Sequence, residues 1–93
     1  MATLDITKVK EHKTTEPTLT PYGVWKLVDK ALKTEDLDTI PSQMVYTYVQ
    51  NKLIPAVKVL KEGGDWQVRV TRSDADKWVT KYVGRRLEKA QTA

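Results

Sequence analysis

The chain contains no cysteine, no phenylalanine and a single histidine among its 93 residues. Without cysteine, no disulfide can brace the fold, and neither a thiolate metal site nor a cysteine nucleophile is available. The lack of cysteine also fits a reducing compartment such as the cytoplasm. The lone histidine, His12, lies in a polar N-terminal segment, so the serines have no histidine partner in the predicted helices and nucleophilic catalysis is not expected.

Long apolar runs and glycine-rich loops are missing as well. No stretch of about 18 apolar residues occurs, so no membrane span is expected. The first residues contain no apolar core segment of the kind that a signal peptide has. The pair Gly63-Gly64 is typical of a turn and not of a phosphate-binding loop. The sequence therefore predicts a non-enzymatic protein with no metal, no cofactor and no membrane partner.

The positive charge is concentrated in the second half of the chain. Residues 1–40 carry six basic and seven acidic side chains, a net charge of −1. Residues 41–93 carry ten basic and five acidic ones, a net charge of +5. A basic half of this kind favours a polyanionic partner such as nucleic acid.

Apolar periodicity predicts one small domain with three helices and one hairpin. Residues 1–19 are rich in Thr, Lys, Glu and Pro, and we expect a flexible N-terminal tail there, with a short strand in LDITKVK as the alternative. The folded domain then covers residues 20–93. Its predicted elements are a helix over 21–33, a helix over 41–52, a hairpin formed by AVKVL and WQVRVT, and a helix over 74–89.

Local signals mark the ends of the predicted helices. Thr20 is the expected N-cap of the first helix, and Ser73 is the expected N-cap of the last. A left-handed residue at Asn51 or Lys52 is expected to end the second helix. Because the chain has no phenylalanine, its tryptophans are expected to fill the core. These tryptophans are Trp25, Trp66 and Trp78.

The second helix carries two different stripes. Its apolar stripe, expected in the core, consists of Met44, Val45, Tyr48, Val49 and Leu53. The opposite side carries uncharged hydrogen-bonding groups, where a solvated helix usually carries Lys and Glu. Such groups can read base edges in the DNA major groove, and Gln and Asn can bond adenine bidentately. The residues predicted to contact DNA from this helix are Ser42, Gln43, Tyr46, Thr47, Gln50 and Asn51.

Cations on or beside the hairpin provide the second predicted contact. Basic side chains suit phosphate oxygens, although charges of this kind also protect an edge strand against aggregation. The predicted order of helix, helix, β-hairpin and helix is the layout of a winged helix-turn-helix. The predicted fold is thus mainly α with a small β-hairpin. The hairpin residues predicted to contact the DNA backbone are Lys58, Lys61, Arg69 and Arg72.

The stretches PSQMVYTYVQNKLIPAVKV and GGDWQVRVTRSDADKWV resemble a known family. They are similar to the DNA-binding domain of the MerR superfamily, and most of all to its small excisionase-like members, the recombination directionality factors. Leu53-Ile54-Pro55-Ala56, Trp66-Gln67-Val68 and Ser73-Asp74-Ala75-Asp76 match the family pattern in order, within residues 20–88. The sequence departs from the pattern in its longer connection TEDLDTI and in having Asn51-Lys52 where a glycine is common.

The resemblance implies a protein that binds double-stranded DNA and directs site-specific recombination in the cytoplasm of a bacterial or phage-infected cell. Its implied partners are double-stranded DNA, an integrase, and further copies of itself on adjacent sites. A small transcriptional regulator with the same domain is the close alternative. An alternative of another class is a protein-interaction adaptor that uses the polar face of the second helix; its binding should be insensitive to salt, whereas DNA binding weakens steeply with salt.

Overall fold

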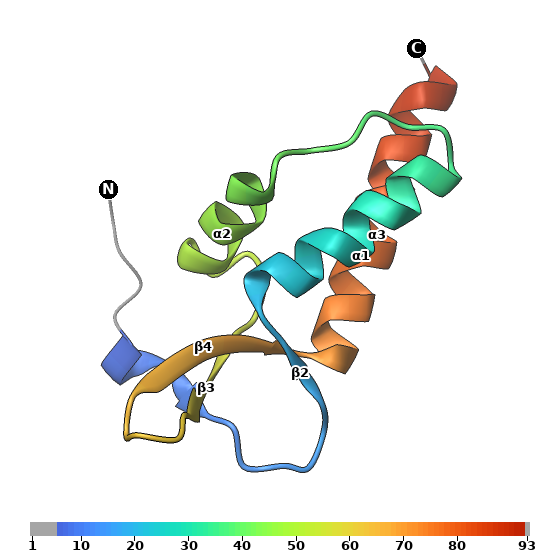
Figure 1. The fold of residues 1–93 in the computed structure, drawn as a ribbon. Coiled ribbons are helices and arrows are strands. Elements are labelled where there is room, and N and C mark those ends of the chain that lie inside the picture. The colour runs from blue at the N-terminus through green and yellow to red at the C-terminus, as the bar shows by residue number, and fades with distance from the viewer. Residues whose placement is uncertain (1–5, 93) are drawn as a thin grey trace.

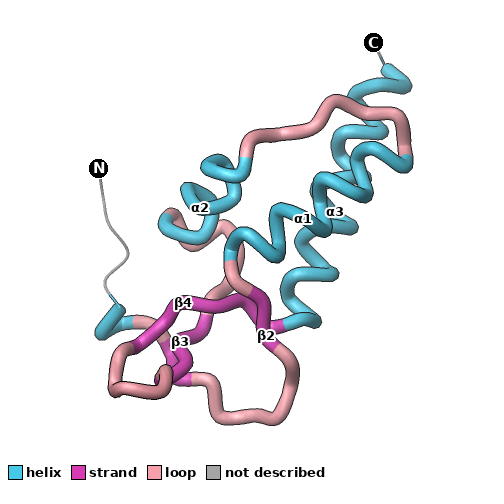
Figure 2. The backbone as a smooth tube through the Cα atoms, in the orientation of Figure 1, coloured by secondary structure: helices cyan, strands magenta, loops and turns pink. Residues whose placement is uncertain are grey.

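A computed structural model describes residues 6–92 of the chain, with the exception of the Thr92 side chain. These residues form a mixed α/β fold with three α-helices and a four-stranded sheet (Figures 1 and 2). The helices are α1 (Pro21–Thr34), α2 (Ser42–Gln50) and α3 (Arg72–Thr92), and a short 3-10 helix η1 (Ile6–Lys8) precedes them. The strands are β1 (Lys10–Glu11), β2 (Thr18–Leu19), β3 (Val57–Leu60) and β4 (Trp66–Thr71).

The sheet is larger than the predicted small hairpin. Its strand order is β1-β3-β4-β2, with the antiparallel hairpin β3–β4 at the centre. Strand β1 pairs in parallel with β3, and β2 pairs antiparallel with β4. Both added strands have only two residues, too few for an alternating pattern to appear in the sequence. Their pairing depends on the hairpin that they border, so the sequence pattern could not reveal it.

The N-terminal segment, predicted as a flexible tail over residues 1–19, lies along this sheet where it is described. The backbone N–H of His12 donates to the Lys58 carbonyl at 2.9 Å, and that of Arg72 donates to the Pro17 carbonyl at 2.9 Å. The alternative of a short strand in LDITKVK is wrong for most of that stretch, because Ile6–Lys8 form η1 and only Lys10 belongs to β1. Residues 1–5 of the predicted tail lie outside the described residues.

Helix α1 follows its sequence signals closely. The Thr20 Oγ1 atom accepts a hydrogen bond from the Gly23 backbone N–H at 3.0 Å, and Pro21 occupies the first turn. This geometry confirms the predicted N-cap. At the other end, Asp36 adopts a left-handed conformation with φ of 57°, and the Leu37 N–H donates to the Leu32 carbonyl at 2.8 Å. Such a 6→1 bond is typical of a Schellman ending, which turns the chain away from the helix axis.

The connection from α1 to α2, residues 35–41, is held by side chains of two helices. The indole Nε1–H of Trp25 donates to the Ile40 carbonyl at 2.6 Å. A guanidinium N–H of Arg86 donates to the Asp38 carbonyl at 3.4 Å. Since Ile40 is itself buried, these contacts fix where the chain enters α2 despite the length of the connection.

Helix α2 ends in the predicted manner. Lys52 adopts the left-handed conformation with φ of 61°. The Lys52 N–H donates to the Val49 carbonyl at 3.1 Å, and the Leu53 N–H donates to the Tyr48 carbonyl at 2.9 Å. This pair of bonds completes a Schellman motif and directs the chain towards β3.

Helix α3 begins at Arg72, directly after β4, and its predicted cap was wrong. Thr71 caps the helix through its Oγ1 atom, which accepts from the Asp74 N–H at 3.3 Å. The Ser73 N–H donates to Oε1 of Glu16 at 2.8 Å. Strand β4 continues into the helix without a loop, so the capping position moves two residues towards the N-terminus.

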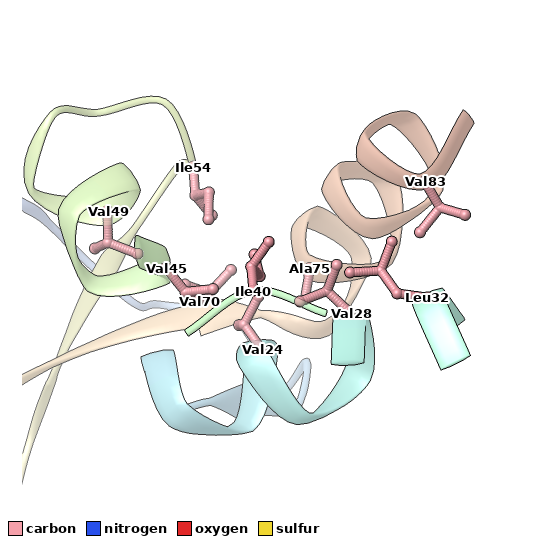
Figure 3. Packing of buried hydrophobic residues seen from close by; sticks show 10 residues of the cluster. All are labelled: Val24, Val28, Leu32, Ile40, Val45, Val49, Ile54, Val70, Ala75 and Val83. Atoms are coloured by element: carbon pink, nitrogen blue, oxygen red, sulfur yellow. The ribbon is translucent and has the colours of Figure 1, made fainter. Parts of the chain in front are cut away.

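The core is small and mostly aliphatic (Figure 3). Helix α1 packs against both α2 and α3, and the base of β4 closes the core. None of the helices in residues 6–92 combines the length and the hydropathy that crossing a membrane requires. The buried apolar residues are Val24, Val28, Leu32, Ile40, Val45, Val49, Ile54, Val70, Ala75 and Val83.

Three residues that the sequence assigned to the core are exposed. Trp66 is 38% exposed, Met44 is 37% exposed and Leu53 is 62% exposed. Trp66 pairs with Leu60 at the end of the hairpin that projects away from the helices (Figure 1), so nothing of the core reaches it. Trp25 and Trp78 are half-buried and pack against the core as predicted.

Candidate nucleic-acid interface

At the centre of helix α2, the apolar stripe is buried and the polar stripe is exposed, as the sequence predicts. Val45 and Val49 are buried. We define the polar face of α2 as the six residues predicted to read bases; Ser42 lies on the same side of the helix as the valines, three residues before Val45, and the other five are exposed. Ser42 is half-buried, and Gln43, Tyr46, Thr47, Gln50 and Asn51 are exposed.

The hydrogen-bonding groups of this polar face differ in whether they already form a hydrogen bond within the protein. The Thr47 hydroxyl donates to the Gln43 carbonyl one turn earlier, at 3.1 Å. Its oxygen lone pairs therefore remain as acceptors for an outside donor. The amides of Gln43 and Gln50 lie at the surface of the short helix and can each donate and accept. The face is thus able to make both kinds of hydrogen bond with a base edge.

A surface hollow of about 520 Å³ joins this face to the sheet and to the start of α1. Tyr46 and Gln50 line it from α2, Gln67 lines it from β4, and Tyr22 lines it from α1. We call it the α2–β4 hollow. Sequence analysis did not identify Tyr22 or Gln67 as site residues. The sequence signal for Gln67 was its place between Trp66 and Val68 in an alternating strand. No such signal exists for Tyr22, because its place beside the hollow depends on how α1 packs.

The two hairpin lysines that were predicted to contact DNA differ in their surroundings. The Lys58 ammonium lies 4.7 Å from the centroid of the Trp66 ring, a cation–π contact that holds the charge at the projecting end of the hairpin. Lys61 is exposed at the turn, where its backbone carbonyl accepts from the Gly64 N–H at 3.0 Å. Gly63 and Gly64 have φ of 101° and 93°, which glycine adopts without steric cost.

The two predicted arginines are engaged within the protein. The Nε–H of Arg69 donates to the Thr18 hydroxyl at 2.6 Å, and Nη2 donates to the Thr18 carbonyl at 2.8 Å. Its Nη1 donates to Oε1 of Gln67 at 3.2 Å. Arg72 forms an exposed ion pair with Asp76 at 3.2 Å. Arg69 therefore joins β2 to β4, and the charge of Arg72 is offset by a carboxylate.

Two titratable groups near these elements have shifted pKa values. The hydrogen bonds from Ser73 at the start of α3 lower the pKa of Glu16 below its usual value. Burial raises the pKa of Tyr48, with a further contribution from the neighbouring Tyr82 hydroxyl. Tyr48 packs against the rings of Trp78 and Tyr82, with centroids 5.8 and 6.3 Å away. Glu16 bonds the start of α3 and Tyr48 packs against α3, and neither belongs to the polar face of α2.

Comparison of the chain with protein-family models, with curated protein sequences and with solved structures gives no match. The assignment of a function therefore depends on the geometry and chemistry of these surfaces.

Proposed function

We propose that this protein binds double-stranded DNA as a winged helix-turn-helix domain. In this proposal α1 and α2 form the helix-turn-helix, α2 enters the major groove, and the β3–β4 hairpin is the wing that follows the backbone. The observation that carries the proposal is the exposed, uncharged polar face of α2, which lies next to a projecting hairpin with Lys58 and Lys61.

The polar face supplies the base contacts in this arrangement. Gln50 and Gln43 can bond bidentately to adenine, and Tyr46 can contact a thymine methyl group or a sugar. The lysines of the hairpin supply contacts to phosphates that position the domain and carry no sequence information. By the resemblance to excisionase-like proteins, we propose that the protein is an accessory factor of site-specific recombination, acting in the cytoplasm beside an integrase. A small transcriptional regulator would use the same surface.

A protein-interaction adaptor is the second candidate. It is favoured by the exposed aromatic rings of Tyr22 and Tyr46 around the α2–β4 hollow, since a hollow lined by aromatic and amide groups also suits a peptide. The two candidates differ in the role of charge. Binding to DNA releases counterions, so its affinity falls steeply with salt, whereas docking of a neutral peptide does not depend on salt in this way.

The test is fluorescence anisotropy with labelled duplexes over a salt series. A preferred sequence is first selected from a random duplex library. With about four to six phosphates neutralised, the affinity should fall by roughly two to three decades between 50 and 200 mM salt. Gln50→Ala should weaken binding to the selected site more than to random duplex, and Gln91→Ala, an exposed glutamine of α3, serves as the matched control. Absence of binding to any duplex at low salt would overturn the proposal.

A further inference from the structure

A second hollow, of about 270 Å³, lies where the N-terminal segment meets the end of α2. Its floor is apolar and includes Val49 and Ile54. Its rim carries Lys8 and Lys10 from the N-terminal segment and Lys52 from the end of α2. We call it the lysine-rimmed hollow. Because Val49 also lines the α2–β4 hollow, the two hollows are neighbours at the last turn of α2.

The pairing of β1 with β3 extends this cluster of cations onto the hairpin. Glu11 is opposite Lys58 in the parallel register, and the His12 N–H bonds the Lys58 carbonyl at 2.9 Å. A third, shallow hollow is lined by Lys10 and Lys13 on one side and Lys58 on the other, with Glu11 as the carboxylate between them. Residues that are far apart in the sequence thus form one basic surface. We call Lys8, Lys10, Lys13, Lys52 and Lys58 the lysine surface.

Glu11 brings one carboxylate to this surface against five ammonium groups, so the surface keeps a net positive charge. Lys8, Lys10, Lys13 and Lys52 are exposed, and none of them forms an ion pair with a carboxylate of residues 6–92. Like charges gathered in this way repel one another and destabilise the folded state when no counter-ion is present. An anionic partner would remove that repulsion, so the arrangement suits a repeated anion such as a line of phosphates.

The position of the lysine surface beside α2 favours the phosphate backbone of DNA over other polyanions. Figure 1 shows the start of the described chain (residues 6–11), the projecting end of the hairpin and α2 on one side of the molecule, with α3 on the opposite side. Lys52 follows Asn51, the last residue of the polar face of α2. A duplex with α2 in its major groove therefore has a backbone strand at the end of α2, where the lysine surface begins.

We infer that the N-terminal segment is a phosphate-binding part of the DNA interface, in which Lys8, Lys10 and Lys13 act together with Lys52 and Lys58. This inference rests on the proposed function. It extends the DNA interface to the N-terminal segment, although residues 1–40 carry a net charge of −1. The contribution of the lysines is independent of sequence, since phosphates are the same at every base step. Their effect should therefore appear in the salt dependence and not in the choice of site.

The test is a triple substitution, Lys8→Gln/Lys10→Gln/Lys13→Gln, measured on selected and random duplexes. Glutamine keeps part of the aliphatic stem and removes the charge. The slope of log affinity against log salt should fall by about two to three units, at about 0.9 per lost phosphate contact. The affinity at 100 mM salt should fall roughly 10- to 100-fold, and equally for both duplexes. Melting curves of the free proteins verify that each variant is folded.

The matched control removes three exposed lysines from α1 and α3: Lys30→Gln/Lys77→Gln/Lys81→Gln. Both triple variants lose the same net charge, so a difference between them measures position and not total charge. Equal effects of the two variants would overturn the inference and leave the proposed function standing. Failure of the unchanged protein to bind any duplex would instead overturn the proposed function.

A second measurement uses the unchanged protein and does not depend on how the variants fold. Lysines are acylated with a water-soluble ester, with and without a saturating duplex, and the modified sites are found by mass spectrometry. The lysine surface should lose most of its reactivity in the complex, whereas Lys30 and Lys81 should not. Unchanged reactivity of Lys8, Lys10 and Lys13 in the complex would overturn the inference, as would protection by anionic phospholipid vesicles but not by duplex.

Discussion

Replacement of Arg69 tests whether this arginine holds the sheet together or contacts DNA. Its guanidinium makes three hydrogen bonds, two of them to Thr18 of β2. Hydrogen bonds from a charged group contribute about 1.5–3 kcal/mol when their partner stays buried. Because Arg69 is half-buried, we expect Arg69→Ala to cost about 2–3 kcal/mol in all. For a domain of this size, that loss lowers the Tm by roughly 10–20 °C.

The partner of Arg69 allows the same contact to be measured by a double-mutant cycle. Thr18→Val removes the hydroxyl acceptor and keeps the side-chain shape, so its coupling to Arg69→Ala should be about 1 kcal/mol. Arg85→Ala, at an exposed position of α3, controls for the loss of one charge. Chemical denaturation of the four cycle members gives the coupling. A Tm unchanged by Arg69→Ala, together with a salt slope for DNA lower by about one unit, would show that Arg69 binds phosphate and that its contact with Thr18 is incidental.

Three further predictions concern α2 and the start of α3. Val49→Ala should destabilise the domain by about 1–3 kcal/mol because it leaves a cavity in the core, whereas Gln50→Ala should leave the Tm unchanged and lower discrimination between selected and random duplex by about 1–3 kcal/mol; the opposite result would place the polar face in the core. Lys52→Gly should raise the free energy of unfolding by about 0.5–1 kcal/mol, since glycine adopts the left-handed conformation without strain, and denaturant melts that show a loss would contradict this. Glu16 has a lowered pKa in the folded state, so its contribution to stability is present at pH above its unfolded value and is lost as the pH falls through the folded value. Glu16→Gln should therefore lower the Tm at neutral pH and reduce the acid dependence of the Tm, as measured by melts between pH 3 and pH 7; an unchanged pH profile would show that the bond to Ser73 does not form in solution.

The division of α2 into a packing stripe and a polar face would let a helix of nine residues serve both stability and the proposed binding. Helix α2 is held in the fold by Val45 and Val49 and by the tilted contact of the Tyr48 ring with Trp78. The exposed side chains on the other side contribute little to packing, so substitutions there should have little effect on stability. The same division makes the substitutions on the two faces separable by experiment.

The helices and the hairpin could be predicted from the sequence because their signals are local. Apolar residues at helical spacing identified α1 and the centre of α2, and Thr20 caps α1 through a bond within three residues of itself. The glycine pair marked the turn of the hairpin. The errors arose at the ends of these elements. Leu53 continues the apolar stripe of α2 in sequence, yet it follows the left-handed Lys52 and points to solvent.

The sequence by itself determined the three helices, the β3–β4 hairpin and the two stripes of α2, because each depends on residues close to one another in the chain. Only the tertiary structure decided that the N-terminal segment borders the hairpin, that Arg69 bonds Thr18, and that Lys13 lies beside Lys58. Two-residue strands have no periodicity to read, and their hydrogen bonds are made with partners about fifty residues away. The charge of the first forty residues gave no sign of a basic surface, since its lysines gather only when β1 pairs with β3.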